Sequence, residues 1–362
     1  LANYRRLFNH LRQRRRILRH AARQSSLPLG DLDSEKFSDF IWRRLFAKSL
    51  QSGDRQTVGS GTFRTLGLTR SQMNFALSQR YLPWLEPGGF TVDTSDYDIF
   101  FCQSPFPAAV SSPTKMVIRY HDSVPIFHPD TIQNKTAHLR SHYSALKHNV
   151  SNQAYFACVS AATRKGLLEI FPELEDRSCV IHNIIPEEYF NSEEEYDVAE
   201  IVKLRRQVLA AEADMPCRQL EFEPDSAFLL MVSSIEPRKN HELLLDAYER
   251  LRLHGKSRLK IVLVGGAGWG KDHFRERLLQ RQAHGDLIYL SGVPAAELGF
   301  LYRHALATIC PSVAEGFDYS GVEAMASGGL VMASDIPVHR EVYRDGALFF
   351  DRYDSGKLAE LV

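Results

Sequence analysis

Short apolar runs alternate with amphipathic stretches through the second half of the chain. Residues 228–235 form one such run, whereas 241–251 places apolar side chains at Leu244, Tyr248 and Leu251. The three-to-four spacing is typical of a helix that buries one face, and a continuous apolar run is typical of a strand buried on both faces. We predict strands at 228–235, 259–266, 287–292, 306–312, 330–335 and 347–351, and helices at 241–251, 271–282, 294–305, 319–329 and 337–343.

Strands that alternate with helices in this way predict a parallel sheet with helices on both faces. The first half of the chain shows the same pattern less regularly, and residues 1–90 fit it poorly. Its predicted elements are strands at 98–105, 115–122, 154–160 and 178–184 and a helix at 136–150.

The pattern breaks at residues 191–224, where we predict a linker or a peripheral helix. A chain of 362 residues is also longer than a single core usually grows. We therefore expect two α/β domains in tandem, at 1–212 and 213–362.

Composition narrows the class of protein. The formal net charge is zero, which gives no overall attraction to nucleic acid. The apolar run at 154–162 is far shorter than the ~20 residues that a membrane span needs. The five cysteines include no Cys-x-x-Cys pair, which favours free thiols in a reducing compartment over a disulfide frame or a zinc site. We expect a soluble protein of the cytoplasm.

Charge is concentrated near the start of the chain. Residues 4–23 carry eight arginines and no acidic side chain, with a partial apolar stripe from Leu7, Leu11, Ile17 and Leu18. We favour a basic, solvated helix. The alternative is a surface that docks on anionic lipid at the inner face of a membrane. Binding of nucleic acid has no recognition motif to support it.

The strand exits are the candidate sites, because ligands of open parallel sheets bind at the carboxyl ends of strands. Arg238 and Lys239 follow the strand at 228–235 and precede a helix, with Asn240 as the candidate N-cap. Helix N-termini favour anions, so a basic pair here fits a clamp on a diphosphate. Two exposed charges on a surface loop are an equally good interpretation.

Glycines follow the next strand. The sequence from Gly265 to Lys271 lacks a dinucleotide-binding motif, since Lys271 takes the place of the last glycine in Gly-x-Gly-x-x-Gly. We expect these glycines to let a ligand or the other domain approach the backbone closely.

Two glutamates eight positions apart follow the strand at 306–312. Glu315 leaves the strand and Gly316 permits a tight turn, while Glu323 lies on the next helix. A carboxylate accepts two hydrogen bonds from vicinal hydroxyls, so Glu323 fits a diol. The alternative is that Glu315 is an ordinary acidic residue at the start of a helix and that Glu323 is exposed to solvent. Small residues such as Gly321 and Ala324 indicate a tightly packed helix and weigh against that alternative.

Two strand exits of the first half carry polar side chains. His121 and Asp122 follow the strand that starts at 115, and Asn183 follows the strand that starts at 178. A histidine at a strand end is often only a half-buried side chain with its hydrogen bonds made. Beside a ligand, His121 could instead contact a sugar hydroxyl or support charge at the reacting carbon.

These motifs together resemble the retaining glycosyltransferases of family 4. The resemblance rests on EPRKN, GG, SGV, EGF with its E-x7-E pair, RYHD, CVS and VIHNIIPEEYF, in this family's order and spacing, and covers about residues 115–351. It implies the GT-B fold, an α/β architecture of two Rossmann-like domains in tandem that face a cleft.

The resemblance also implies roles. Arg238 and Lys239 would hold the diphosphate of a nucleotide sugar and Glu323 the ribose hydroxyls, while Glu315 and His121 would contact the donor sugar. The implied catalytic residues are Glu315, His121, Arg238 and Lys239. The implied donor-binding residues are Arg238, Lys239, Glu323, Glu315, Gly316, Phe317, Asp318, Tyr319, Ser320, Val293 and Gly265.

The chain departs from the family pattern in three places. Asp318 brings a charge where glycine is usual, beside the expected diphosphate, so it has to point away or bind a sugar hydroxyl. Isoleucine follows Asn183 where the family has glycine, so a role transfers only weakly to this residue. The sequence also ends near the last predicted strand, so we expect the final crossover helix to be lacking.

We expect a hexosyltransferase that moves a sugar from a nucleoside-diphosphate sugar to a glycan or lipid-linked acceptor in surface polysaccharide synthesis. Mannose from GDP-mannose is the favoured donor, with no metal and no other cofactor, because Arg238 and Lys239 take the metal's place. The alternatives are a GT-B-like sugar-nucleotide epimerase and a non-catalytic subunit that binds nucleotide sugars.

Overall fold

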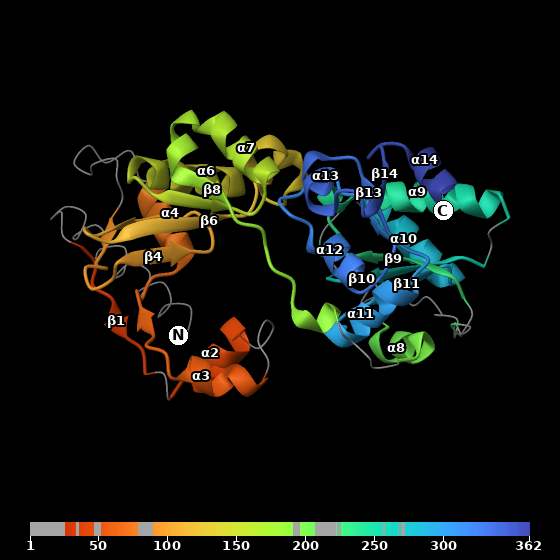
Figure 1. Cartoon of the computed structure of the whole chain (residues 1–362), viewed down its shortest axis with the longest axis horizontal. Coiled ribbons are helices and arrows are strands. Elements are labelled where there is room, and N and C mark those ends of the chain that lie inside the picture. Colours follow the sequence, from red (N-terminus) through yellow and green to blue (C-terminus); the bar gives the residue numbers. More distant parts are fainter. Residues whose placement is uncertain are drawn as a thin grey trace. The chain divides into compact units, whose positions relative to one another are not determined.

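The computed structural model describes residues 26–33, 36–46, 52–78, 90–190, 196–206, 222, 226–255, 258–266, 268 and 272–362. The predicted basic stretch at 4–23 and the predicted domain boundary between 212 and 213 lie outside the described residues. The chain divides into two compact units (Figure 1). Unit 1 comprises Leu1–Tyr120, Ala137–Ala157 and Leu167–Cys179, and unit 2 comprises His121–Thr136, Cys158–Gly166 and Val180–Val362.

Unit 1 contains most of a four-stranded sheet in the order β4-β6-β7-β8. Its strands are β4 (Ile99–Cys102), β6 (Lys115–Tyr120), β7 (Tyr155–Cys158) and β8 (Ser178–Val180). All four predicted strands and the helix α6 (Lys135–Ser151) are confirmed. The irregular start of the unit contributes a small core around Leu27, Phe90 and Val92.

The remaining elements before β9 are mostly short and belong to both units. In chain order they are β1 (Gly30–Asp31), α2 (Ser38–Ile41), η1 (Trp42–Phe46), η2 (Ser52–Asp54), α3 (Arg55–Gly59), β2 (Arg64–Thr65), α4 (Arg70–Ser78), β3 (Thr91–Val92), β5 (Ala109–Val110), α5 (Val124–Phe127), η3 (Pro129–Thr131), α7 (Ala161–Ile170), η4 (Pro172–Arg177), η5 (Glu187–Tyr189) and α8 (Val198–Arg205). Helix α8 is the peripheral helix expected between 191 and 224.

Unit 2 is built on a six-stranded parallel sheet in the order β11-β10-β9-β12-β13-β14. Its strands are β9 (Phe228–Val232), β10 (Lys260–Val264), β11 (Leu287–Leu290), β12 (Ala307–Cys310), β13 (Val331–Ser334) and β14 (Ala347–Phe350). Every predicted strand of this half is confirmed. Because the chain moves outward from β9 in one direction and from β12 in the other, the order reverses between these two strands.

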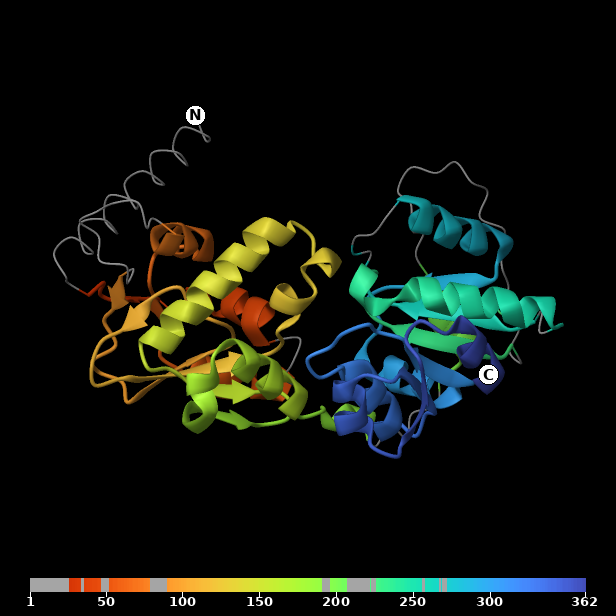
Figure 2. The same ribbon diagram turned by 90° about the horizontal axis from the view of Figure 1, so that it is seen from above.

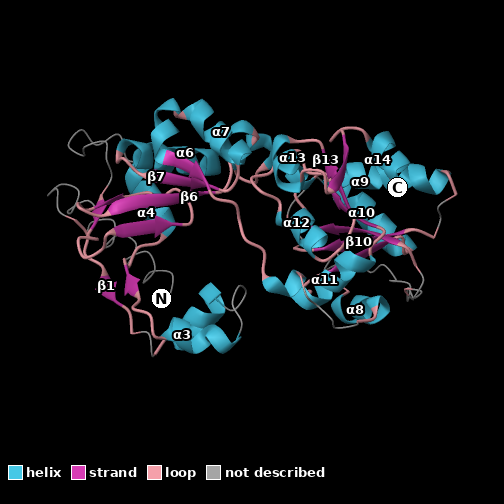
Figure 3. Cartoon of the chain, in the orientation of Figure 1, coloured by secondary structure: helices cyan, strands magenta, loops and turns pink. Residues whose placement is uncertain are grey.

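Helices cover both faces of this sheet (Figure 3). They are α9 (His241–Leu253), α10 (Asp272–His284), α11 (Ala295–His304), α12 (Tyr319–Ala326), α13 (Pro337–Tyr343) and α14 (Ser355–Leu361). The first five were predicted. Helix α14 was not, and it packs along α9 near the carboxyl end of the chain (Figure 2). No helix within the described ranges is long and apolar enough to cross a membrane.

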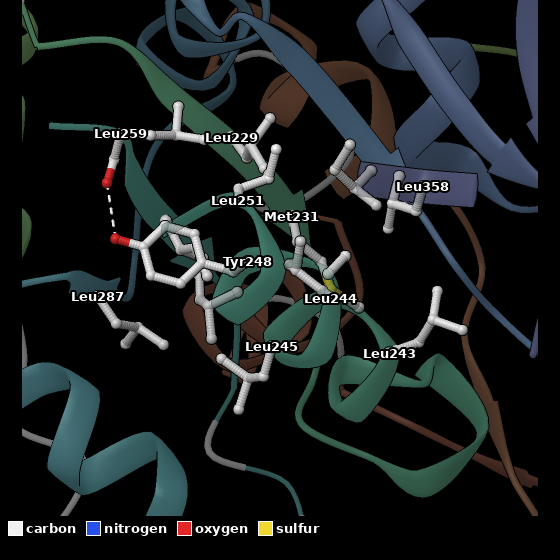
Figure 4. Packing of buried hydrophobic residues seen from close by; sticks show 14 of the residues in the cluster. Leu229, Met231, Leu243, Leu244, Leu245, Tyr248, Leu251, Leu259, Leu287 and Leu358 are labelled. Carbon is white, nitrogen blue, oxygen red and sulfur yellow. Dashed lines mark hydrogen bonds between the residues drawn. The ribbon is translucent and has the colours of Figure 1, made fainter. Parts of the chain in front are cut away.

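The side chains along each strand point alternately to the two faces of the sheet, so unit 2 has one hydrophobic core on each face. Leu229 and Met231 point to the face covered by α9, α10 and α14, where Tyr248 donates a hydrogen bond of 2.7 Å to the Leu259 carbonyl (Figure 4). Leu230, between them in the sequence, points to the face covered by α11, α12 and α13. Successive strand side chains point to opposite faces, so a run that is buried on both sides must be apolar throughout.

Candidate functional site

The loops after β9 and β12 meet where the strand order reverses. The Val313 amide donates to the Arg238 carbonyl at 2.9 Å, and the Arg238 side chain donates to the Ala314 carbonyl at 3.0 Å. Asn240 stands at the N-cap position of α9 with a φ of 58°, but it makes no capping bond. The predicted N-cap position is thus confirmed without a capping bond, and the Asn240 amide instead donates to the carbonyls of Pro311 at 3.1 Å and Arg352 at 2.9 Å. These bonds fix the two loops against each other.

A pocket of about 290 Å³ opens in unit 2 at this place. Such a reversal is where open α/β sheets bind their ligands. The predicted site residues that line it are His121, Lys239, Glu315, Gly316, Phe317, Asp318, Tyr319, Ser320 and Glu323. Its lining also includes Asp122, Val159, Asn183 and Val232. Arg238 stands behind this lining, while Gly265 and Val293 do not contribute to it.

Glu315 lies between the two cations. Its carboxylate pairs with Arg238 and lies 2.6 Å from Lys239 Nζ, and 6% of its side chain is exposed. Burial alone would raise the pKa of Glu315, but Lys239 and Arg238 outweigh burial and hold it below its ordinary value. Burial would likewise lower the pKa of Lys239, yet the Glu315 and Asp318 carboxylates raise it. All three groups are therefore charged at neutral pH.

Asp318 occupies the N-cap position of α12 with a φ of 64°, a conformation that aspartate tolerates better than most residues. Its carboxylate points into the protein. It accepts hydrogen bonds from Ser320 Oγ at 2.7 Å and from His339 Nε2 at 3.1 Å, and its side chain is 3% exposed. The charge that replaces the usual glycine is thus directed at buried partners as well as bordering the pocket.

Gly316 is required by close packing. A Cβ at this position would lie 1.8 Å from the His121 carbonyl oxygen. The Gly316 carbonyl also accepts hydrogen bonds from Ser160 Oγ at 2.7 Å and Thr163 Oγ1 at 3.1 Å. The sequence marked the Cys-Val-Ser strand end that contains Ser160 but assigned it no role. Together these contacts hold the turn after Glu315 against the His121 strand end.

Among the described residues, no cationic side chain pairs with Glu323. It accepts a hydrogen bond from Tyr302 Oη at 3.0 Å, and the Tyr302 ring is fully buried. Burial, with the nearby charge of Asp318, raises the pKa of Glu323 to about 7, although the Tyr302 bond opposes the rise. The carboxyl therefore changes its charge close to neutral pH.

Helix α12 is packed as its small residues predicted. A Cβ on Gly321 would lie 2.2 Å from Tyr343 Oη, and Ala324 is fully buried. The helix ends at Gly328, whose φ of 82° suits glycine, and a Cβ on Gly329 would lie 2.3 Å from the Tyr302 carbonyl oxygen. Tight packing of α12 fixes where Glu323 points.

The glycines after β10 serve packing within unit 2. Gly265 has a φ of 153°, and a Cβ there would lie 2.2 Å from the Ser233 carbonyl oxygen. Gly268 approaches the Ile235 carbonyl in the same way. The close neighbour that the sequence predicted for these glycines is thus the loop after β9. Val293 is half-buried and packs against the core beside α11.

Part of the chain matches a known protein family. Residues 217–362 match the family of glycosyl transferases group 1. The chain is 34% identical over 127 residues to the O-antigen chain mannosyltransferase B of Escherichia coli, which covers 35% of this chain and 33% of that protein. It is 25% identical over 237 residues to the O-antigen chain mannosyltransferase RfbU of Salmonella typhimurium, which covers 66% and 57%. These alignments span less than two thirds of either relative.

Solved structures share the fold. HepE of Anabaena, in complex with UDP-glucose, superposes with a TM-score of 0.52 at 17% identity, over 74% of this chain and 68% of that one. TarM superposes with a TM-score of 0.53 at 14% identity, over 84% and 52%. Such low identities speak for the fold alone. Residues 217–362 therefore belong to the glycosyl transferases group 1 family, and the chain has the GT-B fold.

Proposed function

We propose that the chain is a retaining hexosyltransferase and that its nucleoside-diphosphate sugar donor binds in the pocket at the β9–β12 reversal. One observation carries the proposal. Lys239 of the basic pair after β9, the first residues of α12 and the Glu323 carboxylate, which are distant in sequence, line a single pocket. A donor of this class presents a diphosphate and a ribose diol, which match these two kinds of group.

The diphosphate is assigned to the basic end of the pocket. Lys239 lines it, and Arg238 lies behind Lys239 against Glu315. The first residues of α12 add backbone N–H groups, which bind anions at a helix N-terminus. Glu315 already balances part of the positive charge, so it holds the two cations in place and keeps them from repelling each other.

The ribose diol is assigned to Glu323. A carboxylate accepts hydrogen bonds from both hydroxyls of a cis-diol. Tyr302 holds one carboxylate oxygen, and α12 is fixed by its glycine contacts. The pocket therefore offers an acceptor group already aimed, which reduces the cost of ordering side chains on binding.

Catalysis would be electrostatic. When the bond between the sugar and the diphosphate breaks, negative charge grows on the departing phosphate. We expect Lys239 and the N–H groups of α12 to stabilise that charge directly and Arg238 to add to the positive potential, while the ion pairs with Glu315 hold both cations in place. His121 is exposed at the pocket and can contact the sugar. No pair of carboxylates of the kind that glycosidases use is required.

We further infer a role in the synthesis of a surface polysaccharide, with mannose as the sugar, GDP-mannose as the donor and a glycan or lipid-linked acceptor. The support is the printed activity of the relatives, two O-antigen mannosyltransferases. UDP-glucose is the competing donor, because HepE was solved with it.

A panel of UDP-, GDP-, ADP- and TDP-sugars tests the donor. We expect one nucleotide to raise the melting temperature selectively, since at a given concentration a ligand that binds the folded protein more tightly stabilises it more. Arg238→Ala should abolish the shift, whereas Arg340→Ala, an exposed arginine paired with Asp335, should leave it unchanged. A panel without any shift would contradict the proposal.

Product analysis then separates the alternatives. Transfer of the sugar to a mannose-containing glycan acceptor, with the anomeric configuration of the donor kept, is the expected result. Epimerised donor formed without acceptor would indicate an epimerase. Binding of the nucleotide without turnover over a wide acceptor panel would indicate a non-catalytic subunit.

A further inference from the structure

Asp318 and His339 form a buried pair behind the pocket. Asp318 Oδ2 lies 3.1 Å from His339 Nε2, and the exposed fractions of their side chains are 3% and 0%. His339 comes from α13, and its ring stacks on Tyr343 with 5.0 Å between centroids. Neither the sequence motifs nor the comparisons assigned His339 a role.

The hydrogen-bond partners of His339 fix its protons. Nδ1 lies 2.9 Å from the Ser334 carbonyl oxygen, which can only accept. Ser334 Oγ, 3.2 Å from Nδ1, donates its one hydrogen to the Ser312 carbonyl at 2.6 Å and so also accepts from the ring. Nδ1 therefore carries a hydrogen.

Nε2 faces the second acceptor. An ionised Asp318 carboxylate can only accept, so the contact at 3.1 Å requires a hydrogen on Nε2 as well. A ring with hydrogens on both nitrogens is an imidazolium cation. The arrangement is thus a buried ion pair, and pairing is what makes a buried charge tolerable.

The other groups around Asp318 agree with an ionised carboxylate. Lys239 Nζ lies 4.0 Å from Oδ1, and Ser320 Oγ donates to the same oxygen. Its other titratable neighbours in the described structure include the Glu315 and Glu323 carboxyls, and Cys310 and Tyr343, whose pKa values burial raises, so that these last two are neutral at pH 7. Burial alone would raise the pKa of Asp318, but Lys239 and His339 bring it well below its usual range.

We propose that His339 is a positioning residue that neutralises Asp318 through a doubly protonated ring, so that an acidic residue can stand at the start of α12 without repelling a bound diphosphate. The inference rests on the proposed function, because it concerns the anion that the pocket would hold. Without the charge of His339, Asp318 and Glu315 would balance Arg238 and Lys239 completely. The charge of His339 makes the site one unit more positive toward the ligand than it would otherwise be, with Glu236 also 3.9 Å from Arg238.

The protonation state can be measured without any ligand. In ¹⁵N-histidine-labelled protein at pH 7, we expect both ring nitrogens of His339, assigned by their loss in His339→Gln, to carry hydrogen. A His339 ring with one bare nitrogen at pH 7 would overturn the ion pair.

Binding of inorganic pyrophosphate, UDP and GDP tests the consequence by calorimetry. His339→Gln can still donate to Asp318 but is neutral, and we expect about tenfold weaker binding of each anion, the size of one charge lost at short range in a partly buried site. The double variant Asp318→Asn/His339→Gln removes both charges and should return to within about threefold of the wild type.

Two results would contradict this consequence. Unchanged binding in His339→Gln would show that the charge is not needed, and equally weak binding in the double variant would show that the loss is only structural. If His339→Gln does not fold, the ring spectrum of the wild type, with its signals assigned through bonds, decides the proposal. If no anion binds to the wild type, the proposed function fails, while the ring spectrum still decides the state of the pair.

Discussion

Each end of the pocket has a buried glutamate, and the surroundings of the two carboxyls shift their pKa values in opposite directions. Glu315 and Glu323 are eight positions apart, and both are largely buried. Glu315 lies between Lys239 and Arg238, which lower its pKa despite burial. Glu323 has the hydroxyls of Tyr302 and Tyr189 as donors, and burial raises its pKa to about 7. The first is a fixed charge, whereas the second changes its charge near neutral pH.

The difference follows from what each end would bind. A basic end that holds an anion needs cations whose charge does not change. A buried carboxylate between two cations keeps both of them charged and close together. An end that binds neutral hydroxyls needs an acceptor such as a carboxylate, but no cation beside it. The physical properties of Glu315 and Glu323 therefore match the assignment of phosphate to one end and ribose to the other.

The largest expected effect breaks the basic end. Lys239→Ala removes a charge that faces the departing phosphate and leaves Glu315 with Arg238 alone. We expect sugar transfer to fall by roughly 10²–10³, the usual cost of one preorganised donor to developing charge. Lys357→Ala, an exposed lysine on α14 paired with Glu360, is the matched control. Unimpaired transfer by Lys239→Ala would contradict the assignment of the diphosphate to this end of the pocket.

The next effect tests the turn on which both ends depend. In Gly316→Ala the new methyl group would lie 1.8 Å from the His121 carbonyl oxygen, so the turn has to move. We expect a loss of about 1–3 kcal/mol in the free energy of unfolding, as in other overpacked sites. Chemical denaturation measures it. Gly266→Ala, where a Cβ meets no atom within 4 Å, is the control, and equal stability of the two variants would show that the turn is not constrained.

How far the sequence predicts this site depends on the kind of interaction. The strands and helices from 228 onward follow from hydrophobic pattern alone, since each buries one or two complete faces. Arg238, Glu315 and Glu323 stand at strand exits or on the helix after one, where a general rule directs attention. The resemblance then supplied roles that the pattern could not.

Contacts between distant segments were beyond the sequence. Nothing local indicates that the Gly316 carbonyl meets Ser160, or that His339 meets Asp318, because each pair depends on the packing of separate elements. Asn240 takes the expected N-cap position, but the sequence does not show that its Nδ2 donates to the Pro311 carbonyl of a distant loop or that it makes no capping bond. Two of the predicted donor residues, Gly265 and Val293, serve packing in the described structure instead of lining the pocket.

A pH series sharpens the comparison at the ribose end. Since the pKa of Glu323 is raised to about 7, the free protein carries a carboxylic acid below that pH and a carboxylate above it. The diol prefers the carboxylate, so nucleotide affinity should rise with pH up to about 7 and level off above it. Below pH 7 we expect a loss that approaches tenfold per pH unit, since one proton is taken up per site.

Titration calorimetry from pH 5.5 to 8.5 measures this dependence, with Glu323→Gln as the variant that should flatten it. Asp122 also lines the pocket and has a raised pKa, because burial outweighs the nearby Arg238. Asp122 is thus a second possible origin of the pH dependence. If Glu323 is the origin, Asp122→Asn should keep most of the dependence. A slope that survives in Glu323→Gln would move its origin away from Glu323.

The smallest effect comes from the hydroxyl behind Glu323. Tyr302→Phe removes the bond of 3.0 Å to the carboxylate and adds no new group, in a ring that stays fully buried. That bond favours the ionised form, so its loss should move the midpoint of the pH series upward and weaken nucleotide binding by a few-fold at pH 7, in line with about 0.5–1.5 kcal/mol for one hydrogen bond. At pH 8.5, where Glu323 is ionised in both proteins, the difference should shrink. An equal loss at every pH would mean that Tyr302 acts through packing and that its hydrogen bond does not influence the pKa of Glu323.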